Sequence, residues 1–146
     1  MKSKYLYHGS SGELKGSKLN PSWGEDSEER PENNLFAVYA TDRKDLAIVM
    51  GILGCEDVLG GSIDEYQGDK LNAVIYGDFP KQEFIYLHYL PIKTFSQTEI
   101  DKHQFVSKVA VSPIKTEKIR IRNYYNLFRV GTRMETEDWV KKYKSK

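Results

Sequence analysis

The sequence contains a single cysteine, Cys55, among its 146 residues. One cysteine can form neither an intramolecular disulfide nor a cysteine-based metal cluster, which favours a reducing compartment. The chain also lacks an excess of either charge, because 22 Lys and Arg residues are balanced by 21 Asp and Glu residues. The resulting net charge of +1 gives no overall attraction to nucleic acid or to an anionic membrane.

Long hydrophobic runs are absent too. A membrane-spanning helix needs about 20 apolar residues in succession, and no segment approaches this length. The opening Met-Lys-Ser-Lys leads into an alternating segment instead of the apolar stretch of a secretory signal. We therefore expect a soluble, cytoplasmic protein with no membrane partner. With 39% hydrophobic and 29% charged residues, residues 1–146 are expected to form one domain.

Alternation and turn signals predict many short strands and few helices. We expect strands at residues 4–10, 35–40, 73–76, 84–90, 105–111 and 118–121, and loops at 14–32 and 51–61. A buried helix should follow an N-cap at Thr41 or Asp42 and end near Leu53, and an amphipathic helix should span about 136–143. One early helix followed by many strands favours an α+β domain with a largely antiparallel, split sheet.

Ligand-capable residues end the first expected strand. His8, Gly9 and Ser10 provide an imidazole, a backbone without a Cβ and a hydroxyl. His8 can hydrogen-bond a ribose hydroxyl, and Gly9 can present its N–H and C=O to a carboxamide. Tyr39, in the second expected strand, offers an aromatic face for stacking. These residues predict a site for a planar, polar ligand.

The segments Tyr5–Ser10 (YLYHGS) and Phe36–Thr41 (FAVYAT) together resemble the first two signature strands of the ADP-ribosyltransferase fold. The resemblance is to the His-Tyr-Glu branch, which includes diphtheria toxin, the poly-ADP-ribose polymerases and the small rifampin ADP-ribosyltransferases. It covers roughly residues 4–53 and 84–121. It implies two small, mostly antiparallel sheets with a few helices, and a cleft that binds NAD as a substrate without a metal.

The resemblance also implies residue roles. In that family the His holds the NAD ribose, the Gly pairs with the nicotinamide amide and the Tyr forms the pocket wall, which gives these roles to His8, Gly9 and Tyr39. Cleavage of the nicotinamide–ribose bond passes through an oxocarbenium-like state, so the ribose must be held and positive charge stabilised. The strand carrying His8 should be central and lie beside that carrying Tyr39, with both side chains in one cleft. The expected NAD-contacting set further includes Tyr7, Ser10, Ala40, Thr41 and Met50; the polymerases carry a second stacking tyrosine at the position of Met50.

The third signature departs from the family pattern. Its usual residue is a Glu at the start of a late strand, but the matching segment Gln104–Ser107 (QFVS) begins with glutamine and resembles the Glu-Trp-Val-Ser of some small bacterial relatives. A glutamine can hydrogen-bond the ribose but brings no negative charge to the cation. Gln104 is therefore the expected third residue, and Asp101 or Glu99 just upstream is an alternative source of the carboxylate.

Three functions remain open. The first is NAD-dependent transfer of ADP-ribose to an acceptor that the sequence does not identify: a protein, a nucleic acid, a small molecule or water. The second is a non-catalytic nucleotide-binding module of the same fold, which Gln104 and Met50 favour. The third is an RNA 2′-phosphotransferase-like enzyme, ranked last because Tyr39 occupies the position of their second His.

Other site types have weaker support. The Gly-rich stretch from Gly51 to Gly61 lacks the Lys-Ser/Thr end of a phosphate loop. The three His residues have no metal-ligand spacing, so no metal is expected, and His88 is predicted to be structural. The segment Lys118–Arg122 should place its cations on one strand face, which suits a solvated edge strand as well as a nucleic-acid surface.

Overall fold

The computed structural model describes residues 4–23, 35–65, 70–99 and 101–144. The strands are β1 (Leu6–Ser10), β2 (Ser22–Trp23), β3 (Phe36–Thr41), β4 (Gly60–Glu65), β5 (Asn72–Tyr76), β6 (Phe84–Leu90), β7 (Ser96–Gln97), β8 (Gln104–Ser107), β9 (Lys115–Arg120) and β10 (Phe128–Val130). The helices are α1 (Lys44–Leu53), the 3-10 helix η2 (Ile121–Leu127) and α2 (Arg133–Tyr143).

The larger sheet has the strand order β7-β8-β3-β1-β6-β9, and β2 pairs with β3 off this path. Its neighbouring strands are antiparallel. β1 lies inside the sheet with β3 on one side and β6 on the other, which confirms the prediction that the strand carrying His8 is central and next to the strand carrying Tyr39.

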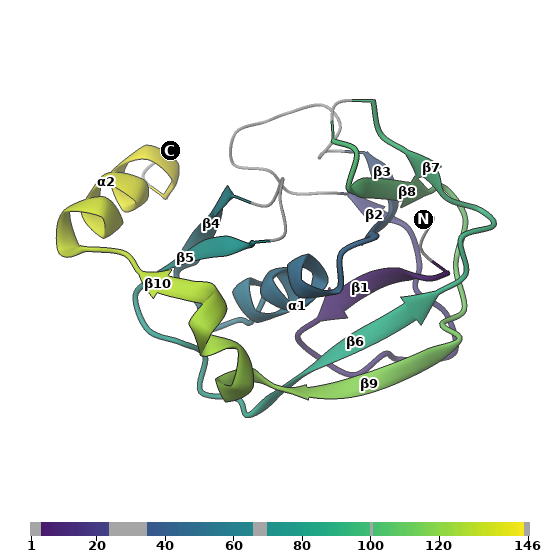
Figure 1. Cartoon of the computed structure of the whole chain (residues 1–146), viewed down its shortest axis with the longest axis horizontal. Helices are drawn as coiled ribbons and strands as arrows, with labels where there is room; N and C mark the ends of the chain where they lie inside the picture. Colours follow the sequence, from purple (N-terminus) through teal and green to yellow (C-terminus); the bar gives the residue numbers. More distant parts are fainter. Residues whose placement is uncertain (1–3, 24–34, 66–69, 100, 145–146) are drawn as a thin grey trace.

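The smaller sheet has the order β10-β5-β4, with β10 parallel to β5 and β4 antiparallel to it. α1 packs between the two sheets, as Figure 1 shows. Ala47, Ile48 and Ile52 of α1 join a core cluster with β6 and β9, whereas Leu46 and Val49 pack against residues of the smaller sheet. A split, mostly antiparallel β core around one buried helix confirms the expected α+β class.

Gly9 allows α1 to approach β1 closely. A Cβ atom at Gly9 would lie 2.0 Å from the carbonyl oxygen of Ala47 and 3.0 Å from the backbone nitrogen of Gly51. A Cβ at Gly51 would in turn lie 3.2 Å from the backbone of Gly9. The two glycines therefore let the helix backbone and the strand backbone touch.

The face of the larger sheet opposite α1 is covered by chain segments instead of a helix. Leu6, Val38 and Ala40 form a buried cluster there with Leu90 and Val111. The segment after β1 crosses this face and forms an isolated bridge between Leu19 and Val111. The loop predicted at 14–32 thus contains the short strand β2, and its residues 24–32 lie outside the described residues.

Several expected element boundaries were wrong. α1 begins at Lys44 with Arg43 as N-cap, because the Thr41 hydroxyl accepts the Arg43 N–H in a local turn instead of capping the helix. The expected strand 105–111 ends at Ser107, whose hydroxyl donates to the carbonyl of Val109 and so closes a turn. α2 begins three residues early because Thr132 and Glu135 form a capping box.

The expected bounds of β9 and β4 were also wrong, and β10 was not predicted. β9 begins at Lys115, before the expected 118, and ends at Arg120, so Arg122 lies in η2 and is not on the strand face with Lys118 and Arg120. β4 occupies a segment partly expected to be a loop, and β10 was not expected. Among the described residues, no helix is long and apolar enough to cross a membrane.

Candidate functional site

The backbone ladder between β1 and β3 consists of a single pair, Tyr7 with Thr41. β1 itself is regular, because it pairs with β6 over its whole length from Leu6 to Ser10. The two strands therefore diverge beyond Tyr7 and Thr41. We call this place, formed by His8, Gly9 and Tyr39, the ladder opening.

Backbone direction in β6 shows which residues of β1 face the opening. The carbonyl oxygens of Glu83 and Tyr89 accept hydrogen bonds from the N–H groups of the two residues that flank β9, Ile121 and Ile114. Because backbone groups in an antiparallel strand alternate between its two neighbours, odd-numbered residues of this segment face β9 and even-numbered residues face β1. His88 therefore directs its N–H and C=O toward β1.

The same alternation continues across the sheet. His8 is paired with His88 and so directs its backbone groups toward β6, whereas Tyr7 and Gly9 direct theirs toward β3. Tyr7 and Thr41 form a hydrogen-bonded pair, so Tyr39, two residues before Thr41, also faces β1. Gly9 and Tyr39 would be the next hydrogen-bonded pair, but the ladder ends before them.

The imidazole of His8 bridges the opening. Its Nδ1 atom lies 2.6 Å from the carbonyl oxygen of Tyr39. A carbonyl only accepts, so Nδ1 carries the proton, and Nε2 of the neutral ring is a hydrogen-bond acceptor. Burial lowers the pKa of His8, and the bond to Tyr39 offsets this only in part. A neutral ring of this tautomer can accept a hydrogen bond from a hydroxyl.

His88 packs behind His8. The two rings are stacked with centroids 6.1 Å apart, and His88 is fully buried. Its Nδ1 lies 2.7 Å from the Thr116 hydroxyl oxygen, and no partner lies within hydrogen-bonding distance of its Nε2 in the described ranges. Burial, and secondarily the neighbouring His8, lower the pKa of His88 to about 4. His88 thus behaves as the structural residue that its strand position predicted.

Tyr39 is held by its own strand. Its hydroxyl accepts the Leu35 N–H at 2.6 Å and donates to the Leu35 carbonyl oxygen at 3.0 Å. Strand alternation sends its ring to the face opposite Val38 and Ala40, which is the α1 side of the sheet. His8, two residues after Leu6, leaves the sheet on the face of Leu6, Val38 and Ala40, opposite to the ring of Tyr39. The expectation that the two side chains lie in one cleft is therefore wrong, and their contact is imidazole to backbone. Burial raises the pKa of the half-buried Tyr39 phenol.

Gln104 lies in one row with Thr41 and Tyr7. It pairs with Thr41 across β8 and β3, and Thr41 pairs with Tyr7 across β3 and β1. Paired residues share a face, so all three side chains leave the sheet on the α1 side. Two strand spacings separate β8 from β1, about 10 Å. Tyr7 packs edge-on against Tyr89, with ring centroids 5.2 Å apart.

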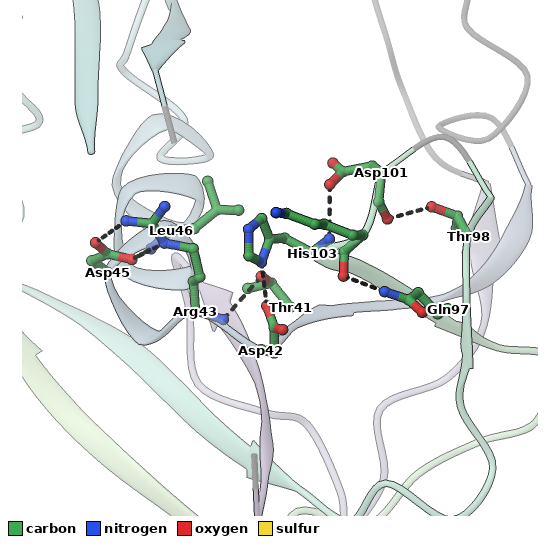
Figure 2. A network of polar contacts seen from close by, with 10 residues as sticks. Thr41, Asp42, Arg43, Asp45, Leu46, Gln97, Thr98, Asp101 and His103 are labelled. Carbon is green, nitrogen blue, oxygen red and sulfur yellow. Dashed lines mark hydrogen bonds and ion pairs between the residues drawn. The ribbon is translucent and has the colours of Figure 1, made fainter. Parts of the chain in front are cut away.

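The other predicted site residues are more scattered. The Asp101 carboxylate accepts the N–H of His103 at 2.9 Å, within the turn before β8 (Figure 2). Met50 is 54% exposed on α1, Ala40 is buried in the core, and Glu99 is exposed. Ser10 ends β1, half-buried. In the described ranges, no three His, Cys, Asp or Glu residues are grouped as a metal site would require.

A cavity that the sequence analysis did not anticipate lies on the smaller sheet, away from the ladder opening. Its volume is about 310 Å³, at the lower end of ligand pockets. Its polar lining comes from Asp64, Asn72, Asn126 and Arg129. The Arg129 guanidinium is already engaged, since it contacts both oxygens of Glu135 at 2.8 Å and Asp64 at 3.4 Å. We therefore interpret these ion pairs of Arg129 as a structural clamp beside the cavity.

Comparison of the chain with protein-family models, with curated proteins and with solved structures found no match.

Proposed function

We propose that the chain is an NAD-dependent, ADP-ribosyltransferase-like protein of the His-Tyr-Glu branch, with the fold that this resemblance implies. It would cleave the nicotinamide–ribose bond at the ladder opening and transfer ADP-ribose to an acceptor. One observation carries the proposal: the β1–β3 ladder ends at Tyr7 and Thr41, so the backbone groups of Gly9 and Tyr39 face an opening beside the neutral ring of His8.

The chemistry of this opening suits nicotinamide. A carboxamide has one acceptor and two donor hydrogens, so it can pair with the N–H and C=O of Gly9 as another strand residue would. The tautomer of His8 leaves Nε2 to accept a hydrogen bond from a ribose hydroxyl. Tyr39 contributes its backbone to the opening, and its ring lies on the α1 side of the sheet, held by two hydrogen bonds to Leu35.

Charge stabilisation is the weakest part of this site. The row of Tyr7, Thr41 and Gln104 contains no carboxylate, and the Asp101 carboxylate is used inside its own turn. The oxocarbenium-like state would then form without the anionic partner that the family usually supplies, and cleavage would be slow. This arrangement favours a second candidate, a non-catalytic module that binds NAD in the same place.

Titration of the protein with NAD tests the proposal, with calorimetry for binding and nicotinamide release for cleavage. We expect His8→Ala to abolish binding, because His8 holds the ribose and bridges the opening. Asn126→Ala is the matched control, since it alters the 310 Å³ cavity on the other sheet. Loss of binding in Asn126→Ala but not in His8→Ala would move the site to that cavity and reject the proposal.

A further inference from the structure

A carboxylate–imidazole pair links two turns at the edge of the proposed site. Nδ1 of His103, just before β8, lies 2.8 Å from Oδ1 of Asp42, just after β3. The two side chains are 17% and 31% exposed, so the bond is partly shielded from water. Figure 2 shows the imidazole between the Asp42 carboxylate and Leu46 of α1.

The turn that carries His103 is closed by its own hydrogen bonds. The Thr98 N–H donates to the Gln104 carbonyl at 2.9 Å, and the Gln97 side chain donates to the Lys102 carbonyl at 2.7 Å. The Asp101 carboxylate accepts the His103 N–H (Figure 2). These bonds hold Gln97, Thr98 and residues 101–104 together, and none of them has a partner in β3.

The turn that carries Asp42 is equally well defined. The Thr41 hydroxyl accepts the Arg43 N–H at 3.1 Å, and the Arg43 guanidinium pairs with Asp45 at 2.8 Å. Asp45 also accepts the N–H of Leu46, which fixes the start of α1. The Asp42–His103 bond therefore joins two ordered turns that come from distant parts of the sequence.

The joint lies one residue beyond the pair of Thr41 and Gln104, which is the last pair of the β3–β8 ladder. The end of a ladder has backbone bonds on one side only, so a side-chain bond just beyond it restrains the terminal residues. Gln104 is such a terminal residue, and it is the residue for which the resemblance implies a hydrogen bond to the ribose.

We propose that Asp42 and His103 are positioning residues whose hydrogen bond holds the Gln104 amide in its place beside Thr41. The inference rests on the proposed function for its ligand, NAD, and it concerns how Gln104 is held. His103 donates from Nδ1 and Asp42 accepts, and neither side chain contacts the reacting atoms.

Two substitutions of His103 distinguish the effect of losing its hydrogen bond to Asp42 from the effect of changing the size of the side chain. His103→Phe keeps a planar ring but removes the donor, whereas His103→Asn returns an amide N–H close to the position of Nδ1. We expect His103→Phe to weaken NAD binding about tenfold, the loss typical of one hydrogen bond to a charged group, and His103→Asn to restore most of it. If nicotinamide is released, KM should rise with kcat little changed in His103→Phe. Gln97→Ala is the control, because it loosens the same turn without touching the bridge to β3.

A double-mutant cycle decides whether the pair acts through Gln104. In a Gln104→Ala background, His103→Phe should have no further effect on the dissociation constant for NAD. Independent effects, or an equal loss in Gln97→Ala, would overturn the inference while the proposed function stands. If the wild-type chain binds no NAD, the proposed function fails, and side-chain NMR of the free protein still tests the positioning. The Gln104 NH2 signals should be sharp in wild type and broadened in His103→Phe, and unchanged signals would reject it.

Discussion

Replacing Gly9 by alanine should destabilise the fold strongly, with or without a ligand. The new Cβ atom would lie 2.0 Å from the Ala47 carbonyl oxygen, where real Cβ contacts are essentially never shorter than 3.0 Å. Because this neighbour is helix backbone and not the end of a flexible side chain, α1 must move away from β1 by about 1 Å. Such a movement loosens the buried contacts of Ala47 and Gly51 at the same time.

Overpacking of a core typically costs about 1–3 kcal/mol and occasionally more, and we expect Gly9→Ala to lie at the upper end. For a domain of this size, a loss of about 3 kcal/mol lowers Tm by roughly 6–12 °C. Urea denaturation followed by far-UV circular dichroism measures the free energy of unfolding, and a thermal scan measures Tm.

Gly12→Ala is the matched control. Nothing lies within 4 Å of its Cβ position, and Gly12 is exposed after the end of β1. Its substitution should change stability little or raise it by up to about 1 kcal/mol, because alanine restricts the unfolded chain. A Gly9→Ala protein as stable as Gly12→Ala would show that α1 does not rest on the β1 backbone and would refute the packing argument.

Three further predictions concern other parts of the chain. Thr132→Ala should cost about 1 kcal/mol through loss of the α2 capping box, whereas Thr132→Ser should retain it, as urea denaturation would show. The pKa of His88 is about 4 in the folded protein against 6.5 ordinarily, so the unfolded chain binds more protons between these values. The free energy of unfolding should therefore fall as the pH drops from about 6.5 to about 4, and His88→Phe should flatten that slope. Gln104→Glu should accelerate nicotinamide release about 100-fold by supplying the missing charge; an unchanged rate with NAD still bound would favour the non-catalytic module.

The central elements could be predicted because local pattern and tertiary environment agree in them. Most apolar residues of α1 and β3 are buried, and so is Leu6 of β1. β4 was partly missed because Gly60 and Gly61 are typical of turns. In the structure the ring of Trp139 and the side chain of Leu53 occupy the space that Cβ atoms at these positions would need. Packing against a distant element therefore stabilises this segment as a strand, and the local sequence contains no pattern that predicts it.

The site shows the same division between local and long-range information. His8, Gly9 and Tyr39 could be selected from the sequence because each ends or interrupts an apolar strand. Their register could not, because the single pair of Tyr7 with Thr41 depends on residues 34 positions apart. The Asp42–His103 pair was missed for the same reason. Nothing in the sequence relates an acidic residue after one strand to a histidine before another unless the two strands are known to be neighbours.

Gly9 connects the stability of this fold to its proposed chemistry. Because Gly9 has no Cβ, α1 can pack directly against its backbone. Its N–H and C=O groups lie in the plane of the sheet and face the ladder opening. A side chain at this position would displace the helix, and a complete β1–β3 ladder would consume the N–H and C=O that a carboxamide needs. The Tyr39 carbonyl oxygen accepts a hydrogen bond from the His8 imidazole instead of from the Gly9 N–H. This acceptor is therefore satisfied although the ladder ends before it. An opening that a neighbouring imidazole stabilises within an otherwise regular sheet is expected at a functional site, where a local rule is broken and compensated nearby.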